Sequence, residues 1–263
     1  MEILGINNLI TKISSHFRGR RDELWMKYFL QDVHISHISM FHNITKTNLE
    51  IQGQDDCRIE DMMNYIRCCQ ELCMEFVSLD KLFSLNVEDA SRNKAVITFD
   101  DGYESVSLVA AKILTDKNIP FTCFITTSFI GKEGYISIEQ LKNLSDNPLC
   151  TIGMHSDQHI FWRNKSSKEL ENDYIKCRRI LADIIGYEPC YYAFPYGSVL
   201  AVSKKNIRVI KKLSPRAIFL TDQRKIVKGD LMDPLSGLPR IDIPGYYKGY
   251  YKKDYIGLDL RKI

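Results

Sequence analysis

Six short apolar runs alternate along the chain with longer stretches in which apolar and polar residues recur at helical spacing. The apolar runs, which have the β-rich character of buried parallel strands, lie at residues 37–41, 95–99, 121–125, 150–153, 191–194 and 217–220. The helical stretches lie at residues 59–73, 104–117, 137–145, 167–185 and 203–213. This alternation of strands and helices predicts an α/β fold with a mostly parallel sheet or barrel.

The run at 95–99 ends in two acidic residues, Asp100 and Asp101, and Gly102 then breaks the strand pattern. Both aspartates are therefore predicted at the carboxyl end of a strand, where α/β folds gather ligands and catalytic groups. Neighbouring side chains leave a strand in different directions, so one aspartate can hold a cation while the other faces a substrate. The alternative is a solvated turn, which is the usual role of an isolated Asp-Asp-Gly sequence.

A second motif carries two histidines, His155 and His159, about fifty positions later. Their spacing of four predicts that both imidazoles lie on one side of a helical turn. Two imidazoles and one carboxylate form a ligand set with open positions, suited to zinc or another divalent first-row metal. Water bound to such an ion ionises near neutral pH and attacks a carbonyl group that the ion polarises. The alternative is a structural pair of histidines.

Three segments in order, Thr98 to Gly102, His155 to His159 and Phe194 to Gly197, resemble the motifs of the NodB-type polysaccharide deacetylases, carbohydrate esterase family 4. The resemblance covers residues 37 to about 244. It implies a distorted (β/α)7 barrel and a metal-dependent deacetylase. It also implies one divalent metal ion, with zinc as the first choice and cobalt, nickel, manganese or iron as the others.

The resemblance assigns a role to each matching position. Asp100 corresponds to the catalytic base, and Asp101, His155 and His159 correspond to the metal ligands. The base must stay ionised, which an adjacent cation favours.

The third motif is Phe194-Pro195-Tyr196-Gly197. By resemblance, the backbone N–H of Tyr196 stabilises the oxyanion of the tetrahedral intermediate, and a fixed donor of this kind is worth several kcal/mol in the transition state. Phe194 and Pro195 are predicted to bind the substrate together with Tyr196. The alternative for Tyr196 is a tight turn, because Pro and Gly flank it.

Two features of the family are missing from their usual places. Many members carry an arginine where this chain has Phe194, and they take their catalytic acid from a late Leu-x-His motif, whereas no histidine follows His159 here. The early segment around His42 resembles the Tyr-His-Asn-Val segment of the biofilm poly-N-acetylglucosamine deacetylases, a circularly permuted branch. There the early histidine is the general acid, so His42 is the candidate acid. Its alternative is a polar residue at a strand end.

The missing arginine has a candidate replacement late in the chain. Leu238 to Ile241 resembles a Pro-Arg-Ile segment of the permuted branch, which implies that Arg240 orients or neutralises Asp100. A surface arginine is the alternative.

Length and composition agree with one catalytic domain. A chain of 263 residues with 44% hydrophobic residues can bury one sizeable core. We predict a helical N-terminal extension at residues 1–31 and a catalytic domain at residues 32–263.

Charge and hydropathy restrict the partners and the location. The formal net charge of +3 is too small to predict nucleic-acid binding. No run of eighteen apolar residues predicts a membrane span, and residues 1–10 lack the features of a secretory signal, so we expect a cytoplasmic protein.

The eight cysteines include no Cys-x-x-Cys pair and are expected to be reduced. The basic segment at 18–21 could contact an anionic membrane surface, or could be a solvated helix packed on the barrel.

The resemblance implies an enzyme that removes the N-acetyl group from an amino sugar and releases acetate. The expected substrate is an N-acetylated polysaccharide or a lipid-linked or nucleotide-linked sugar precursor. A sugar O-acetyl esterase is one alternative, because the same site can cleave an acetyl ester. A catalytically silent barrel that binds glycan is the other, and the missing late histidine is the argument for it.

Overall fold

The computed structural model describes residues 35–45 and 56–244. The N-terminal extension predicted at 1–31, with its basic segment, lies outside the described residues.

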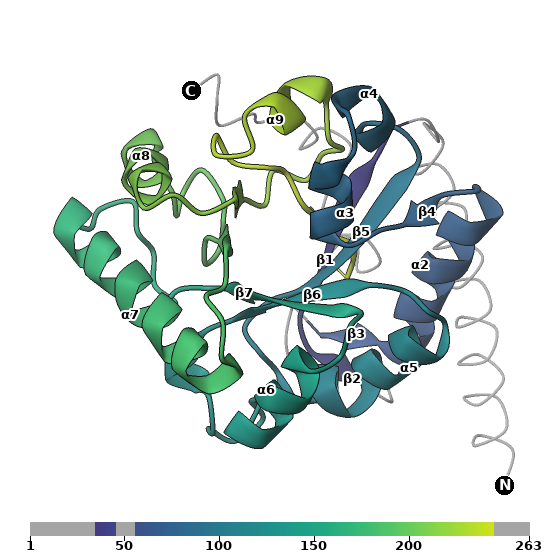
Figure 1. The fold of residues 1–263 in the computed structure, drawn as a ribbon, viewed down its shortest axis with the longest axis horizontal. Helices are drawn as coiled ribbons and strands as arrows, with labels where there is room; N and C mark the ends of the chain where they lie inside the picture. Colours follow the sequence, from purple (N-terminus) through teal and green to yellow (C-terminus); the bar gives the residue numbers. More distant parts are fainter. Residues whose placement is uncertain (1–34, 46–55, 245–263) are drawn as a thin grey trace, which may run out of the picture.

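A parallel sheet forms the centre of the molecule (Figure 1). Along its main path the strands are β1 (His37–Phe41), β5 (Lys94–Phe99), β6 (Phe121–Ile125), β7 (Cys150–Met154), β8 (Tyr191–Ala193), β9 (Ala217–Phe219) and β10 (Ile241–Asp242), and the short strand β4 (Glu75–Phe76) also pairs with β5. The strands of the main path lie in the order β10-β1-β5-β6-β7-β8-β9, and every pairing is parallel. All six apolar runs of the sequence form strands, which confirms the parallel sheet.

The two edges of the sheet meet at the segment that leads into β10. Phe219 of β9 forms a parallel bridge with Leu238, and the Leu220 N–H donates to the Leu238 carbonyl at 2.8 Å. On its other side the same segment pairs with β1, where Ile241 lies opposite Ser39. The sheet therefore curls into a distorted barrel, as the resemblance implied, and its last strand comes from the far end of the described chain.

Helices surround the sheet (Figure 1). The larger ones are α2 (Ile59–Glu71), α5 (Ala111–Asp116), α6 (Ile138–Ser145), α7 (Ser167–Ile185) and α8 (Lys204–Lys212). Capping boxes at Ser137, Ser166 and Ser203 satisfy backbone N–H groups at the starts of α6, α7 and α8. The helix predicted at 104–117 begins at residue 104 as expected, contains the π-helical stretch η2 (Val106–Ala110), and continues as α5.

The remaining elements are too short for their periodicity to show in the sequence. They are β2 (Ile44–Thr45), β3 (Cys57–Arg58), β4 (Glu75–Phe76), α3 (Leu79–Ser84), α4 (Val87–Ala90), η3 (Thr127–Phe129) and α9 (Lys228–Met232).

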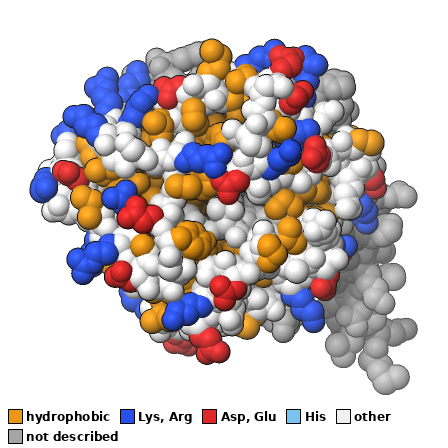
Figure 2. Space-filling view, viewed as in Figure 1, with side chains coloured by type: hydrophobic (Ala, Val, Ile, Leu, Met, Phe, Trp, Pro, Cys, Tyr) orange, Lys and Arg blue, Asp and Glu red, His pale blue; other side chains and the backbone are white. Residues whose placement is uncertain are grey.

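The strands are buried on both faces, which explains their continuous apolar character. Alternate residues enter two hydrophobic clusters: Val96 and Phe124 belong to one, and Ile97 and Ile125 to the other. The face seen in Figure 2 carries interspersed basic and acidic side chains, as the small net charge suggests. Within residues 35–45 and 56–244, no helix has both the length and the apolar character needed to cross a bilayer.

Candidate active site

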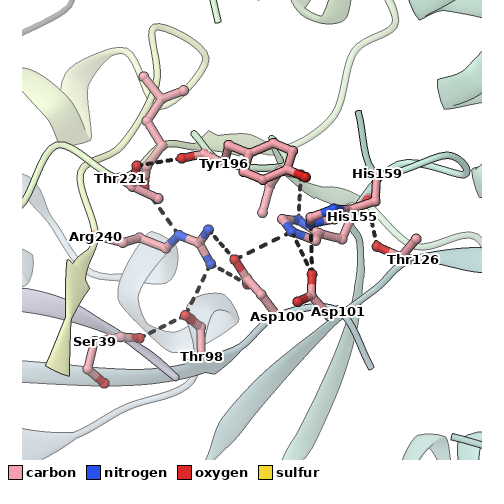
Figure 3. Close-up of polar contacts among 12 residues, drawn as sticks. Ser39, Thr98, Asp100, Asp101, Thr126, His155, His159, Tyr196, Thr221 and Arg240 are labelled. Carbon is pink, nitrogen blue, oxygen red and sulfur yellow. Dashed lines mark hydrogen bonds and ion pairs between the residues drawn. The ribbon is translucent and has the colours of Figure 1, made fainter. Parts of the chain in front are cut away.

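The predicted site residues converge at the carboxyl ends of the strands (Figure 3). Asp100 and Asp101 follow β5, His155 follows β7, and Tyr196 lies three residues beyond β8. Arg240 immediately precedes β10 and reaches the same place from the closing segment. The sheet thus brings together Asp100 and Arg240, which are 140 positions apart.

A sharp turn after β5 separates the two aspartates. The Asp100 N–H continues the strand ladder by donating to the Phe41 carbonyl at 2.9 Å. Asp101 then has φ 70° and Gly102 has φ 84°, both in the left-handed region that Asp tolerates and Gly adopts freely. The turn directs Asp100 toward Arg240 and Asp101 toward the histidines (Figure 3), which confirms that the two side chains diverge.

Arg240 and Asp100 form a bidentate ion pair inside the barrel. Nη1 and Nη2 of Arg240 each donate to a different oxygen of Asp100 at 2.6 Å. Nε donates to the Leu220 carbonyl at 3.2 Å, and Nη1 also lies 3.3 Å from the Thr98 hydroxyl. Arg240 is 0% exposed, so the surface alternative for it is wrong.

This pair keeps Asp100 ionised. Burial alone would raise the pKa of Asp100, but the positive charge of Arg240 and a smaller effect of His155 outweigh it. The pKa of Asp100 therefore lies below its usual value, and the carboxylate can accept a proton at neutral pH.

Asp101, His155 and His159 face one another and offer three donor atoms within 4.8 Å. Oδ1 of Asp101 lies 3.3 Å from Nε2 of His155 and 2.9 Å from Nε2 of His159, at ion-pair distance but without a well-directed hydrogen bond. His155 Nδ1 lies 3.0 Å from the Ala193 carbonyl, which can accept only from a protonated Nδ1. In the neutral imidazole, Nε2 then presents a lone pair toward a buried carboxylate.

These atoms fit a divalent metal ion. A lone pair facing a carboxylate is unfavourable unless a cation lies between them. One carboxylate oxygen and two imidazole nitrogens suit zinc and its neighbours in the first row. The Ala193 carbonyl fixes the orientation of the His155 ring, as partners of metal-binding histidines commonly do.

The geometry of the histidine pair corrects the sequence prediction. Residues 155–159 form a loop, not a helical turn, and Ser156 and His159 have φ values of 69° and 49°. Asp173 of α7 accepts hydrogen bonds from two backbone N–H groups of this loop, those of Asp157 and Gln158, each at 2.9 Å. Sequence reasoning missed Asp173 because it lies in an ordinary amphipathic helix, outside every motif.

His42 lies beside Asp100. Phe41 pairs with Phe99 in the β1–β5 register, so the next residue on each strand is His42 on one and Asp100 on the other. His42 also acts electrostatically on Asp100, whose pKa it helps to lower. The next residue, Asn43, is held by the Ser105 hydroxyl, which donates to Oδ1 at 2.8 Å.

Tyr196 lies in a bend with φ 61° and projects to the surface, where it is 46% exposed. Its carbonyl accepts from the Thr221 hydroxyl at 2.8 Å, which fixes the orientation of this backbone segment. Among the described residues, no backbone carbonyl accepts from its N–H. Its ring stacks on Phe161, with 4.0 Å between ring centroids, and lies 4.8 Å from the ring of His159.

Phe194 and Pro195 of the third motif are buried. Phe194 is 0% exposed and packs edge-on against Tyr192 in the core, and Pro195 is also buried. Substrate binding by these two residues stays a prediction, and the burial of both side chains argues against direct contact. These two apolar side chains pack in the interior of the barrel. Tyr196 is the exposed residue of this motif.

Comparison with known proteins agrees with this geometry. Residues 88–217 match the family model for polysaccharide deacetylases. This stretch contains Asp100, Asp101, both histidines of the second motif and Tyr196, whereas His42 and Arg240 lie outside it. A comparison with curated proteins finds no match.

Several solved structures share the fold. IcaB from Ammonifex degensii is 18% identical with a TM-score of 0.69, over 82% of this chain and 96% of that one. The deacetylase PplD of Streptococcus pyogenes is 15% identical with a TM-score of 0.68, over 79% and 92%. A de-N-acetylase from Aggregatibacter actinomycetemcomitans is 16% identical with a TM-score of 0.66, over 79% and 95%.

The parallel barrel places Asp100, paired with Arg240, beside the Asp101, His155 and His159 cluster, with Tyr196 exposed next to it. Residues 88–217 thus carry a polysaccharide deacetylase domain, the domain of a family whose members hydrolyse N-acetyl amide bonds.

Proposed function

We propose that the protein is a metal-dependent deacetylase that hydrolyses the N-acetyl group of an amino sugar in a glycan and releases acetate. The observation that carries this proposal is the buried pair of Asp100 with Arg240, placed directly beside the Asp101, His155 and His159 cluster. Asp100 Oδ2 lies 3.7 Å from Nε2 of His155, so an ionised base borders the cluster.

Asp101 Oδ1 and the Nε2 atoms of His155 and His159 would hold the ion, with zinc as the first choice. A divalent ion bound there polarises the acetyl carbonyl and makes a bound water more acidic.

The residues of the chain perform the proton transfers. Asp100 accepts a proton from water as the water oxygen adds to the amide carbon. The Tyr196 N–H donates to the carbonyl oxygen as that oxygen becomes negative. His42 then gives a proton to the sugar nitrogen as the C–N bond breaks, which leaves a free amine and acetate. Arg240 keeps Asp100 ionised and correctly oriented at the start of each cycle.

The surface beside the site suits a sugar. Phe161 and Tyr196 are 52% and 46% exposed, and their stacked rings offer an apolar wall next to His159. The apolar face of a pyranose ring can pack against such rings. The Streptococcus pyogenes structure holds acetate, the product that this reaction would release. We infer an N-acetylated glycan as substrate, with lipid-linked and nucleotide-linked sugars as the alternatives.

The first experiment measures acetate release from N-acetylglucosamine oligomers by zinc-loaded protein. Because Asp100 is the only base that we assign, D100N is expected to lower kcat by roughly 10²–10⁴-fold. D146N removes one exposed carboxylate at the end of α6 and is the matched control, with wild-type kcat expected. Equal activity of D100N and wild type would contradict the assignment of the base.

The role of His42 is tested by H42A. A fall in kcat of about 10²-fold or more, with stoichiometric zinc retained, is expected of a missing general acid. No change in kcat would remove His42 from the mechanism.

The substrate series separates the alternatives. Release of acetate from acetyl esters alone would indicate an O-acetyl esterase. Zinc binding without any acetate release, from oligomers, esters, or lipid-linked or nucleotide-linked sugars, would indicate a silent glycan-binding barrel. The missing late histidine favours that second function, and the placement of His42 beside Asp100 argues against it.

A further inference from the structure

The loop that carries the two histidines is anchored from behind by helix α7. Asp173 and Lys176, which are one turn apart on the same helix, both contact it. We call these two residues the α7 clamp.

Asp173 provides the central contact. Its two carboxylate oxygens accept separately from the N–H groups of Asp157 and Gln158, each at 2.9 Å. Asp173 is only 7% exposed, so solvent competes little for these bonds. Burial raises the pKa of Asp173, and the loop N–H groups partly offset that effect. A buried carboxylate that accepts from two consecutive backbone amides fixes the path of the backbone between them.

Lys176 binds the same loop through the side chain of Asp157. Its Nζ donates to Oδ2 of Asp157 at 2.7 Å, while the Thr127 hydroxyl donates to Oδ1 at 2.7 Å. The Ser128 N–H also donates to the Asp157 carbonyl at 3.1 Å. The loop is thus held between α7 on one side and η3 on the other.

The two histidines depend on this support to different extents. His155 is fixed independently, because its N–H donates to the Ile125 carbonyl at 2.9 Å and its ring bonds the Ala193 carbonyl. His159 has φ 49°, and its N–H donates to the Ser156 hydroxyl over a longer distance, 3.3 Å. Ser156 itself has φ 69°. A loop with two side-chain-bearing residues in the left-handed region relaxes unless its surroundings hold it.

Helix α7 is well anchored in the structure and can hold such a contact in place. It spans 19 residues, begins with a capping box formed by Ser166 and Glu169, and ends at Gly186 with φ 83°. Leu170, Tyr174, Cys177 and Leu181 bury one side of it in the main core. Asp173 and Lys176 therefore sit on a helix that is fixed at both ends and along one face.

We propose that the α7 clamp positions His159 for metal binding: Asp173, assisted by Lys176, holds the loop in the form that directs His159 Nε2 toward Asp101. The proposal rests on the proposed function in that the cluster binds a divalent ion. It assigns a positioning role to a helix outside the three motifs.

The test compares D173N with D183N. Both variants remove one carboxylate from α7, but Asp183 is exposed and pairs with Arg179 of the same helix, at 4.0 Å. The amide introduced by D173N offers one oxygen where two backbone N–H groups need acceptors. The measurements are the zinc Kd by competition with a chromophoric chelator, and the visible absorption spectrum of the cobalt-loaded protein. D173N is expected to raise the zinc Kd about 10–100-fold and to change the cobalt spectrum at saturation, as removal of groups that orient metal ligands does.

D183N is expected to keep the wild-type Kd and spectrum. K176M provides a second variant that leaves Asp173 in place, because the Lys176 side chain is 59% exposed. K176M should weaken zinc binding several-fold. If D173N does not fold, the zinc Kd of K176M tests whether the α7 clamp positions His159.

The possible outcomes distinguish a failure of the α7 clamp proposal from a failure of the proposed metal-dependent function. Wild-type zinc binding and cobalt spectra in folded D173N, or in K176M where D173N is unfolded, would overturn the clamp alone. Failure of the wild-type protein to bind zinc would overturn the metal-dependent function and the clamp together.

Discussion

The charge of Asp100 depends mainly on its pairing with Arg240. Both oxygens of Asp100 are bonded to the guanidinium of Arg240, and both residues are enclosed by the barrel. Without the arginine the pKa of this carboxyl would rise, because burial is the largest effect on that pKa and acts to raise it. The same contact therefore supports both the stability and the chemistry of the site.

Removing the arginine is expected to destabilise the protein strongly. R240M leaves Asp100 buried without its counter-ion, and breaking a buried pair in this way costs roughly 3–5 kcal/mol. Urea denaturation of the metal-free protein measures the free energy of unfolding. The double variant R240M/D100N should lose clearly less than the sum of the two single variants, because the unpaired charge is gone. Additive losses would show that the two residues do not interact.

His37 in β1 gives the protein a dependence on pH that is unrelated to the site. Burial, and to a smaller extent the charge of Lys225, lowers the pKa of His37 to about 3, and its Nε2 lies 2.7 Å from the Tyr65 hydroxyl. The unfolded chain binds a proton at this residue below about pH 6.5, whereas the folded chain does not until about pH 3. Stability from this residue is therefore complete above that range and is lost as the pH falls.

H37Q keeps a polar partner for Tyr65 and removes the titration. The difference in the free energy of unfolding between wild type and H37Q should change by about 1.4 kcal/mol per pH unit between about pH 6 and 4, with wild type losing stability toward acid. Urea midpoints of the metal-free proteins across this range measure it. Parallel curves would mean that His37 titrates equally in the folded and unfolded chains.

Among the elements, the turn after β8 that presents Tyr196 is tightly constrained. Gly197 has φ 54°, and a Cβ there would lie 2.9 Å from the Thr221 nitrogen, a backbone atom that cannot easily move. Gly186 also has positive φ, 83°, but a Cβ there would meet nothing within 4 Å. A substitution at Gly186 therefore introduces only backbone strain, whereas one at Gly197 introduces backbone strain and a steric clash.

G197A is expected to displace the Tyr196 N–H and to lower kcat by roughly 10²-fold, the effect of losing one oxyanion donor. G186A should cost only about 1 kcal/mol of stability, from the left-handed residue, and leave kcat unchanged. Kinetics of acetate release and thermal unfolding distinguish the two effects. Wild-type kcat in folded G197A would argue against a catalytic role for the Tyr196 backbone.

How far the sequence predicts the elements depends on their length. The buried strands and the longer helices carry enough repeats of their period to be located within a few residues. The loop at 155–159 shows the limit, because a spacing of four suits a helical turn but the left-handed residues there are set by Asp173, which is distant in sequence. Phe194 shows a second limit of sequence-based prediction, because its position in the motif does not reveal that its side chain points into the core.

At the scale of the whole molecule, the fold rests on the barrel core, and a metal ion bound by Asp101, His155 and His159 would add to its stability. The cluster lies at the rim, and the core is built from apolar side chains independently of it. The metal-free protein should therefore fold, with lower stability than the loaded one.

Zinc at a hundredfold excess over its Kd is expected to stabilise the folded state by about 2.7 kcal/mol, as any ligand that binds only the folded state does. Thermal unfolding with zinc and with a chelator measures the difference. D101N removes the central carboxylate and should abolish the zinc effect, whereas D146N should retain it. An equal zinc effect in D101N would place the ion elsewhere.

The closure of the barrel by residues 238–242 also sets the order in which the protein is made. A ribosome that has released β1 and β5 has already supplied both aspartates, but Arg240 is added 140 positions after Asp100. Until that late segment emerges and inserts between β9 and β1, the nascent chain holds a carboxylate with no counter-ion and a sheet with two open edges. We therefore expect activity only once the closing segment has been synthesised.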